Sequence, residues 1–324
     1  MSRRPARTPF TGLVVGAYAA SPAHRRWDPA AEEEFFEQLA QIPDVGAFEL
    51  PWLGSIHPHD DAWLHRHFPT ALGAVVTDIP YTMGRIAGDP GYGLASVEEG
   101  GRERAVADVG RVRDGVRGLD DAQGRRVVGV VELHSAPRGV RGASDALAKS
   151  LTEIAGWDWD GAELVIEHCD AWREGQIPEK GFLSLDEELD AIERSGADLG
   201  VSLNWGRSVI EGRTPATAVA HARASAGRGL LRGFMASGAA ATPTDFGPAW
   251  IDAHLPFAPE PGLAHTTPGS LMTTSDVRDV LRAAGPLAWA GVKVGCARED
   301  APVAERVALV QEAVAVMMRL RAAA

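Results

Sequence analysis

The chain has 324 residues, of which 45% are hydrophobic and 23% are charged, and its formal net charge is −12. This composition is ordinary for a globular protein with a substantial core. The acidic charge argues against a broad nucleic-acid surface, which needs clustered lysine and arginine. No apolar run reaches the ~18 residues of a membrane span, and no apolar stretch follows the basic N-terminus as it would in a secretion signal. We therefore expect a cytoplasmic protein with no membrane or nucleic-acid partner.

Apolar, β-branched segments alternate along the chain with stretches of helical period, which is typical of a parallel sheet with crossover helices. Eight segments have the composition of strands: residues 12–18, 47–52, 73–79, 127–134, 163–168, 198–204, 230–237 and 289–295. The turn after the first of them lacks the GxGxxG pattern of a doubly wound nucleotide-binding sheet. The pattern predicts a single α/β domain over residues 1–324, a (β/α)8 TIM barrel with a flexible N-terminus at 1–10.

The helices and loops between these strands have signals of their own. Apolar residues recur at helical spacing over 301–321, so this last helix should close the ring against the first strand. Capping residues mark four helix starts: Asp28 before Pro29, Thr214 before Pro215, Ser96 with Glu99, and Ser184 with Glu187. Two connections, 80–95 after the third strand and 238–274 after the seventh, are long enough to be lids or binding loops.

Polar residues occur where the predicted strands end, which in such a barrel is the face that gathers catalytic groups. They are Glu49, Asp78, Glu132, His134, Glu167, Asn204 and Lys293. Because an unpaired buried charge is costly, these groups should form one network. Side chains alternate along a strand, so His168 should point away from Glu167, toward a helix.

We interpret four residues as catalytic and five as substrate-binding. The catalytic candidates are Glu132, His134, Glu167 and Lys293, and the substrate-binding candidates are Glu49, Asp78, Asn204, Arg207 and His254. Only three of the 32 basic residues are lysines, at 149, 180 and 293, and Lys293 alone lies in an apolar run. His254 lies in the long 238–274 connection, from which a polar side chain can enter the pocket.

Four phrases of the sequence resemble the xylose isomerase-like TIM-barrel superfamily and, within it, a bacterial domain-of-unknown-function family. They are FELPW at 48–52, VELHS at 131–135, EHCDAW at 167–172 and SLNWGRS at 202–208. The resemblance implies a sugar isomerase or epimerase, and the superfamily's epimerases hold a divalent metal with Glu, Asp, His and Glu on strands five to eight. Only Glu167 matches this set; the other positions are Asn204, Ser237 and Lys293.

This departure suggests that Lys293 replaces the metal as an electrophile and pairs with Glu167. Our leading prediction is an enzyme that abstracts a proton beside the carbonyl of a sugar or polyol. The assigned roles are proton abstraction by Glu132 or Glu167, oxyanion stabilisation by Lys293 or His134, and binding of substrate hydroxyls by Asn204 and Arg207.

Three alternatives stay open. In an aldolase or lyase, Lys293 would form a Schiff base with the substrate, which requires a lowered pKa. A sugar-binding or regulatory barrel would have no chemistry. A metalloenzyme would bind its ion through Glu167 with Glu132, His134 or His254. The sequence leaves both the metal cofactor and a homo-oligomeric state undecided.

Overall fold

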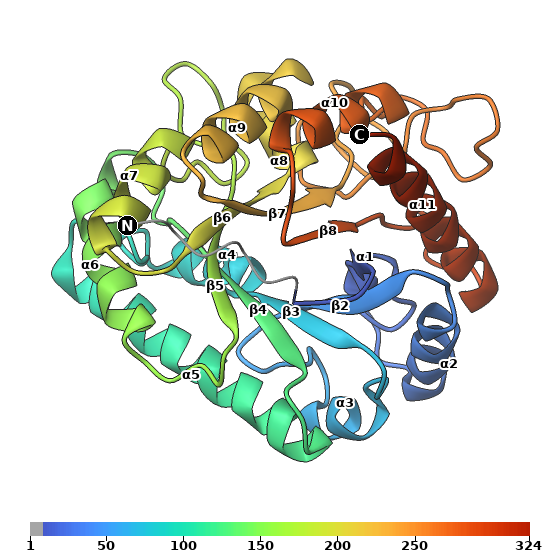
Figure 1. The fold of residues 1–324 in the computed structure, drawn as a ribbon, viewed down its shortest axis with the longest axis horizontal. Coiled ribbons are helices and arrows are strands. Elements are labelled where there is room, and N and C mark those ends of the chain that lie inside the picture. Colours follow the sequence, from blue (N-terminus) through green and yellow to red (C-terminus); the bar gives the residue numbers. More distant parts are fainter. Residues whose placement is uncertain (1–8) are drawn as a thin grey trace.

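Eight parallel strands close into a barrel in chain order, with β8 paired to β1, and the helices surround them (Figure 1). The structure is a computed structural model that describes residues 9–324. The strands are β1 Leu13–Val15, β2 Val45–Pro51, β3 Gly73–Thr77, β4 Val128–Leu133, β5 Glu163–His168, β6 Gly200–Asn204, β7 Leu231–Ala236 and β8 Trp289–Val292. The predicted (β/α)8 barrel is confirmed, and each predicted strand overlaps one of these segments.

The helices occupy the connections between strands. They are α1 Ala17–Ala20, α2 Pro29–Ala40, α3 Asp61–His67, α4 Ile79–Gly88, α5 Glu99–Gln123, α6 Ser144–Ala155, α7 Leu185–Ser195, α8 Trp205–Gly212, α9 Ala216–Gly227, α10 Thr274–Ala284 and α11 Val303–Ala323. The last of them packs against β1, β8 and α2, so the predicted closing helix is confirmed. Among residues 9–324 no helix has both the length and the apolar content needed to cross a bilayer.

Two of the four predicted capping signals are confirmed. The Asp28 side chain accepts a hydrogen bond from the backbone N–H of Ala31, and α2 begins at the following proline. Ser184 and Glu187 form a reciprocal capping box at the start of α7.

The other two signals are wrong. The Ser96 hydroxyl donates to the carbonyl of Gly91 and accepts from the N–H of Glu98. Ser96 therefore stabilises a turn that precedes α5 and does not cap the helix. At α9, Pro215 occupies the capping position and no side chain caps the helix. A capping spacing in the sequence does not fix where the first helical turn starts.

Two apolar layers form the core, one inside the barrel and one between the strands and helices. The inner cluster consists of Phe10, Val14, Ala47, Val75, Val130, Val165, Met235, Ala288 and Trp289. The Phe10 ring lies where side chains on Gly73 and Gly129 would otherwise project, since a Cβ on either would come within 2.8 Å of it. The expected flexibility of 1–10 is therefore wrong for buried Phe10, and residues 1–8 lie outside the described part.

One of the two expected long loops is confirmed. The connection from β7 to α10 has no helix, and paired backbone hydrogen bonds between Gly238 and Leu255 fold it back on itself. The expected loop at 80–95 is wrong because α4 occupies 79–88. Pro80 lies in the first turn of that helix, where a missing N–H costs nothing.

Candidate active site

The centre of the site is a buried ion pair between strands that are not neighbours. Lys293, the residue after β8, donates from Nζ to Oε1 of Glu49 on β2 at 2.6 Å. The pair passes over the end of β1, where a Cβ on Gly16 would lie 2.5 Å from Cγ of Lys293 and 2.9 Å from Oε2 of Glu49. The glycine therefore provides the space for this contact.

Glu167 has a different cationic partner from the one expected. Nη1 of Arg207 lies 2.6 Å from its Oε1, the Thr77 hydroxyl donates to its Oε2 at 2.8 Å, and Nζ of Lys293 is 4.0 Å away. The predicted pairing of Lys293 with Glu167 is thus present only as this long ion pair, because Glu49 is the closer partner of the ammonium. Burial alone would raise the pKa of Glu167, but Arg207 and Lys293 hold it below its ordinary value.

Glu132 on β4 is the carboxyl group without a cation in contact. Its Oε1 accepts from the Ser202 hydroxyl at 2.7 Å, and its buried Oε2 has no hydrogen-bond partner among the described residues. Burial, reinforced by the negative charges of Glu167 and Glu49, raises the pKa of Glu132 well above its ordinary value. Glu132 is therefore a carboxyl group of raised proton affinity beside two carboxylates that are paired with cations.

Lys293 is held as an ammonium ion. Burial would lower its pKa, but the charge of Glu49, with Tyr18 and Glu167, raises it well above the ordinary value. Its Nζ lies 5.1 Å from the centroid of the Tyr18 ring, within the range of a cation–π contact. Tyr18, in the short helix α1, was not among the predicted site residues.

The connection 238–274 adds a second set of charges at the same end of the barrel. Asp252 accepts from Nε of Arg207 at 2.9 Å and from Nζ of Lys180 at 2.8 Å. His254 lies 3.3 Å from Asp252 and shares a hydrogen bond of 3.0 Å with the Ser237 hydroxyl. His254 is located as predicted, whereas Asp252 and Lys180 were missed, although the scarcity of lysine already marked the latter.

Asp78 and His134 lie near each other but do not form a hydrogen bond, since Nε2 of His134 is 3.9 Å from Oδ2 of Asp78. Burial lowers the pKa of His134 to about 3, so its ring is neutral at pH 7, and burial raises the pKa of Asp78 well above its ordinary value. Nδ1 of His134 accepts from the N–H of Ala136 at 3.2 Å, which leaves the proton on Nε2 as a donor.

Asn204, the last residue of β6, caps α8. Its Oδ1 accepts from the backbone N–H groups of Gly206 and Arg207, and its Nδ2 has no partner. Several other polar atoms at these strand ends and in the 238–274 connection are buried without a hydrogen-bond partner among residues 9–324: Glu49 Oε2, Asp78 Oδ1, Glu132 Oε2, His134 Nε2 and Asp252 Oδ1. Buried polar groups are normally satisfied, so this concentration indicates capacity to bind a polar ligand.

The metal expected from the superfamily does not fit these residues. Glu49, Glu132 and Glu167 each offer an oxygen within 4.8 Å of the others, but His134 and His254 are not part of this group. Of the alternative ligands expected beside Glu167, Glu132 therefore lies in this group, whereas neither histidine does. An ammonium and a guanidinium already pair with Glu49 and Glu167, and both would repel a divalent cation placed between these carboxylates.

Comparisons with known sequences identify the family of this chain. The family described as "Domain of unknown function (DUF4862)" matches residues 14–309. An uncharacterized protein of Salmonella typhimurium strain LT2 is 36% identical over 315 residues, which cover 95% of this chain and 97% of that protein.

Solved structures share the fold at low identity. An L-ribulose 3-epimerase superposes with a TM-score of 0.58 and 16% identity, over 97% of this chain and 95% of that one. A xylose isomerase domain protein from Alicyclobacillus acidocaldarius has a TM-score of 0.53 and 14% identity, over 96% of this chain and 98% of that one. The chain therefore belongs to the DUF4862 family, and its barrel is of the xylose isomerase-like type that the sequence resemblance predicted.

Proposed function

We propose that this protein is an enzyme that removes a proton from the carbon beside the carbonyl group of a sugar or sugar-derived polyol, and so isomerises or epimerises it. The observation that supports this most is the buried ammonium of Lys293, held by Glu49 close to the partly unpartnered carboxyl group of Glu132. The similarity in fold to an L-ribulose 3-epimerase points to the same substrate class.

In this proposal Glu132 is the acid–base group. Its raised pKa makes its carboxylate form a stronger base than an ordinary glutamate and its neutral form a proton donor, and its Oε2 is free to meet a substrate. Glu167 is the weaker candidate, because Arg207 and Thr77 hold both of its oxygens and lower its proton affinity.

Lys293 and Arg207 supply positive charge for the oxyanion that forms when the proton leaves. Both are fixed by carboxylates before substrate arrives, and such pre-oriented charge is most effective in a buried site. The Nε2–H of His134 and the free amide nitrogen of Asn204 are donors for substrate oxygens. No step passes through a metal, since the donor set does not fit one.

The aldolase alternative requires Lys293 as a neutral nucleophile. The ion pair with Glu49 has the opposite effect, because it raises the lysine pKa. Borohydride treatment with a ketose should therefore leave Lys293 unmodified, and a stable adduct at this residue would favour the aldolase.

The test of the proposal is solvent deuterium exchange. Chelator-treated protein is incubated in D2O with a panel of aldoses, ketoses and their phosphates, and NMR follows deuterium entering the carbon beside the carbonyl. We expect exchange in at least one sugar by wild type, none above background with Glu132→Gln, and unchanged exchange with Glu103→Gln, an exposed glutamate on α5.

Two results would count against the proposal. Exchange that survives in Glu132→Gln removes the acid–base role of this residue. Sugar binding by wild type, seen as a stable complex with no exchange in any sugar of the panel, supports the non-catalytic binding barrel instead.

A further inference from the structure

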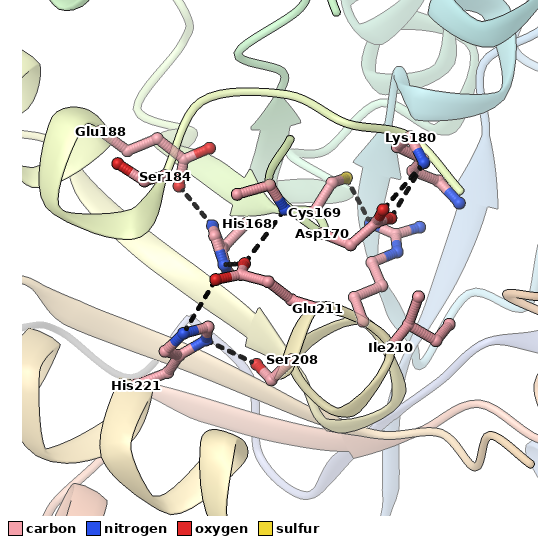
Figure 2. Close-up of polar contacts among 12 residues, drawn as sticks. His168, Cys169, Asp170, Lys180, Ser184, Glu188, Ser208, Ile210, Glu211 and His221 are labelled. Carbon is pink, nitrogen blue, oxygen red and sulfur yellow. Dashed lines mark hydrogen bonds and ion pairs between the residues drawn. The ribbon is translucent and has the colours of Figure 1, made fainter. Parts of the chain in front are cut away.

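A second cluster of titratable side chains lies outside the barrel mouth, between β5 and the helices that follow it. His168, at the end of β5, faces Glu188 and Glu211 (Figure 2), whereas the neighbouring Glu167 contacts Arg207 at the barrel mouth, as alternation along the strand predicted. Its Nδ1 lies 2.7 Å from Oε2 of Glu188 on α7, and its Nε2 lies 3.1 Å from Oε2 of Glu211 on α8.

His221 on α9 approaches the other oxygen of the same carboxylate. Its Nδ1 shares a hydrogen bond of 3.1 Å with the Ser208 hydroxyl, and its Nε2 lies 3.6 Å from Oε1 of Glu211. That last separation is too long for a hydrogen bond. The rings of His168 and His221 stand edge to face with centroids 4.9 Å apart, so both Nε2 atoms are directed at the Glu211 carboxylate.

The separations within the cluster allow a shared ion. Nε2 of His168 lies 3.1 Å from Oε2 of Glu211, and Nε2 of His221 lies 3.6 Å from Oε1 of the same carboxylate; ligand atoms about 2.0–2.1 Å from a tetrahedral zinc ion lie roughly 3.3 Å from one another. One ligand atom from each of the three residues lies within 4.8 Å of the others.

The groups around the cluster are those that support metal-binding histidines. Such a histidine usually donates its second ring N–H to a carboxylate or another oxygen, and here Glu188 and Ser208 take that role for His168 and His221. Glu188 is itself fixed by the Ser135 hydroxyl. The orientation of both rings is therefore set before any ion binds.

We propose that His168, Glu211 and His221 form a binding site for a zinc-like divalent metal ion, which joins β5, α8 and α9 behind the barrel wall. The inference does not depend on the proposed function. Glu211 also accepts from the backbone N–H of Ala171 at 3.0 Å and from Nη2 of Arg173 at 2.6 Å. Each carboxylate oxygen has a second lone pair, so both donors remain as outer partners.

The charge around the cluster favours a cation, because two buried carboxylates, Glu188 and Glu211, contact the ring of His168. All three ligands are buried, with side-chain exposures of 0% for His168, 3% for Glu211 and 11% for His221.

The experiment is a titration of chelator-treated protein with Co2+, whose tetrahedral complexes absorb visible light. We expect saturation at one equivalent per chain and loss of the absorption when Zn2+ is added. His221→Gln should weaken binding at least about 100-fold, and Ser208→Ala, which keeps all three ligands, about 10-fold or more. Glu132→Gln, in the carboxylate group at the barrel mouth, should bind as wild type does.

Three outcomes would overturn the proposal: no tetrahedral Co2+ absorption in wild type, equal affinity in His221→Gln, or loss of binding in Glu132→Gln. Circular dichroism establishes that each variant is folded. Should His221→Gln not fold, Ser208→Ala decides, because an unchanged Co2+ affinity in that variant contradicts the outer-partner role. The readout is metal absorption, so failure of the exchange assay leaves this result unaffected.

Discussion

Lys293 and Glu49 are both fully buried, and each is the closest ionic partner of the other. Removing one member of such a pair leaves a charge in a medium that cannot solvate it, which costs more than the pair contributes when intact. The charge of Glu167 is also compensated in part by this ammonium, which lies 4.0 Å away.

The first prediction concerns this pair. Lys293→Met should lower the free energy of unfolding by about 3–5 kcal/mol, because Glu49 is left without its cation. The double variant Lys293→Met, Glu49→Gln should recover more than half of that loss, since both charges are absent. Urea denaturation at pH 7 measures both. Equal stability of the single and double variants would show that Glu49 does not depend on Lys293.

The second prediction concerns the raised pKa of Glu132. Above the ordinary pKa, the unfolded chain releases a proton that the folded protein retains, so this residue lowers the stability as the pH rises toward its folded value. Glutamine cannot titrate. The stability of Glu132→Gln relative to wild type should therefore increase from pH 4 to pH 8, by up to about 1.4 kcal/mol per pH unit. A flat difference across this range would contradict the raised pKa.

At this scale the sequence predicted which residues lie at the strand ends but not their pairing. The positions of Glu132 and Lys293 could be predicted because alternation and strand order determine them. The positions of Tyr18 and Asp252 could not be predicted, because they depend on the paths of a short helix and a long connection. The preference of Lys293 for Glu49 depends on the missing side chain of Gly16, which no strand pattern reveals.

At the scale of elements, α8 links the two clusters. Asn204 caps its first turn, Arg207 reaches Glu167 inside the barrel mouth, and Glu211 faces His168 and His221 on the outer side. A helix of eight residues thus fixes groups in both places. Its position is expected to respond to changes in either cluster.

The third prediction compares two capping positions. Ser184→Ala removes a reciprocal capping box from α7 and should cost about 1 kcal/mol. Thr214→Ala, at the exposed position that the sequence also marked as a cap, should change stability by less than about 0.5 kcal/mol. Chemical denaturation of both variants tests this prediction. A loss of stability in Thr214→Ala as large as that in Ser184→Ala would mean that the Thr214 side chain caps α9 after all.

Helices and strands were predicted well where a regular apolar pattern extends over many residues, and poorly where a single residue determines the local structure. The strands and the final helix have regular apolar patterns that local sequence reveals. The region after β3 was expected to be a long loop, whereas Pro80 lies in the first turn of α4, a position where proline is compatible with a helix.

For the whole molecule, closure of the barrel depends on the short seam between β1 and β8. It pairs Val14 with Gly291 and Val15 with Val292. A Cβ on Gly291 would lie 2.3 Å from the carbonyl oxygen of Val14 and 2.9 Å from the sulfur of Met235. The approach of the two strands therefore requires a residue without a side chain.

The fourth prediction tests this seam. Gly291→Ala should destabilise the protein by about 1–3 kcal/mol, because backbone atoms of β1 must move to accept the methyl group. Gly84→Ala, in α4 with open space around its Cα, should instead be neutral or stabilising by up to about 1 kcal/mol. Guanidinium denaturation compares the two, and an undisturbed Gly291→Ala variant would mean that the seam is wider than the structure shows.

The exposure of the three lysines also determines which lysine side chain reacts with amine-reactive reagents. Lys180 and Lys293 are buried in ion pairs at the barrel mouth, whereas Lys149 on α6 is exposed beside Glu99. Among the lysine side chains, Lys149 is therefore the one that a fluorophore or surface can reach in the folded protein, on the outer ring of helices. Coupling at this side chain leaves the candidate site free, so ligand binding can be followed on labelled or immobilised protein.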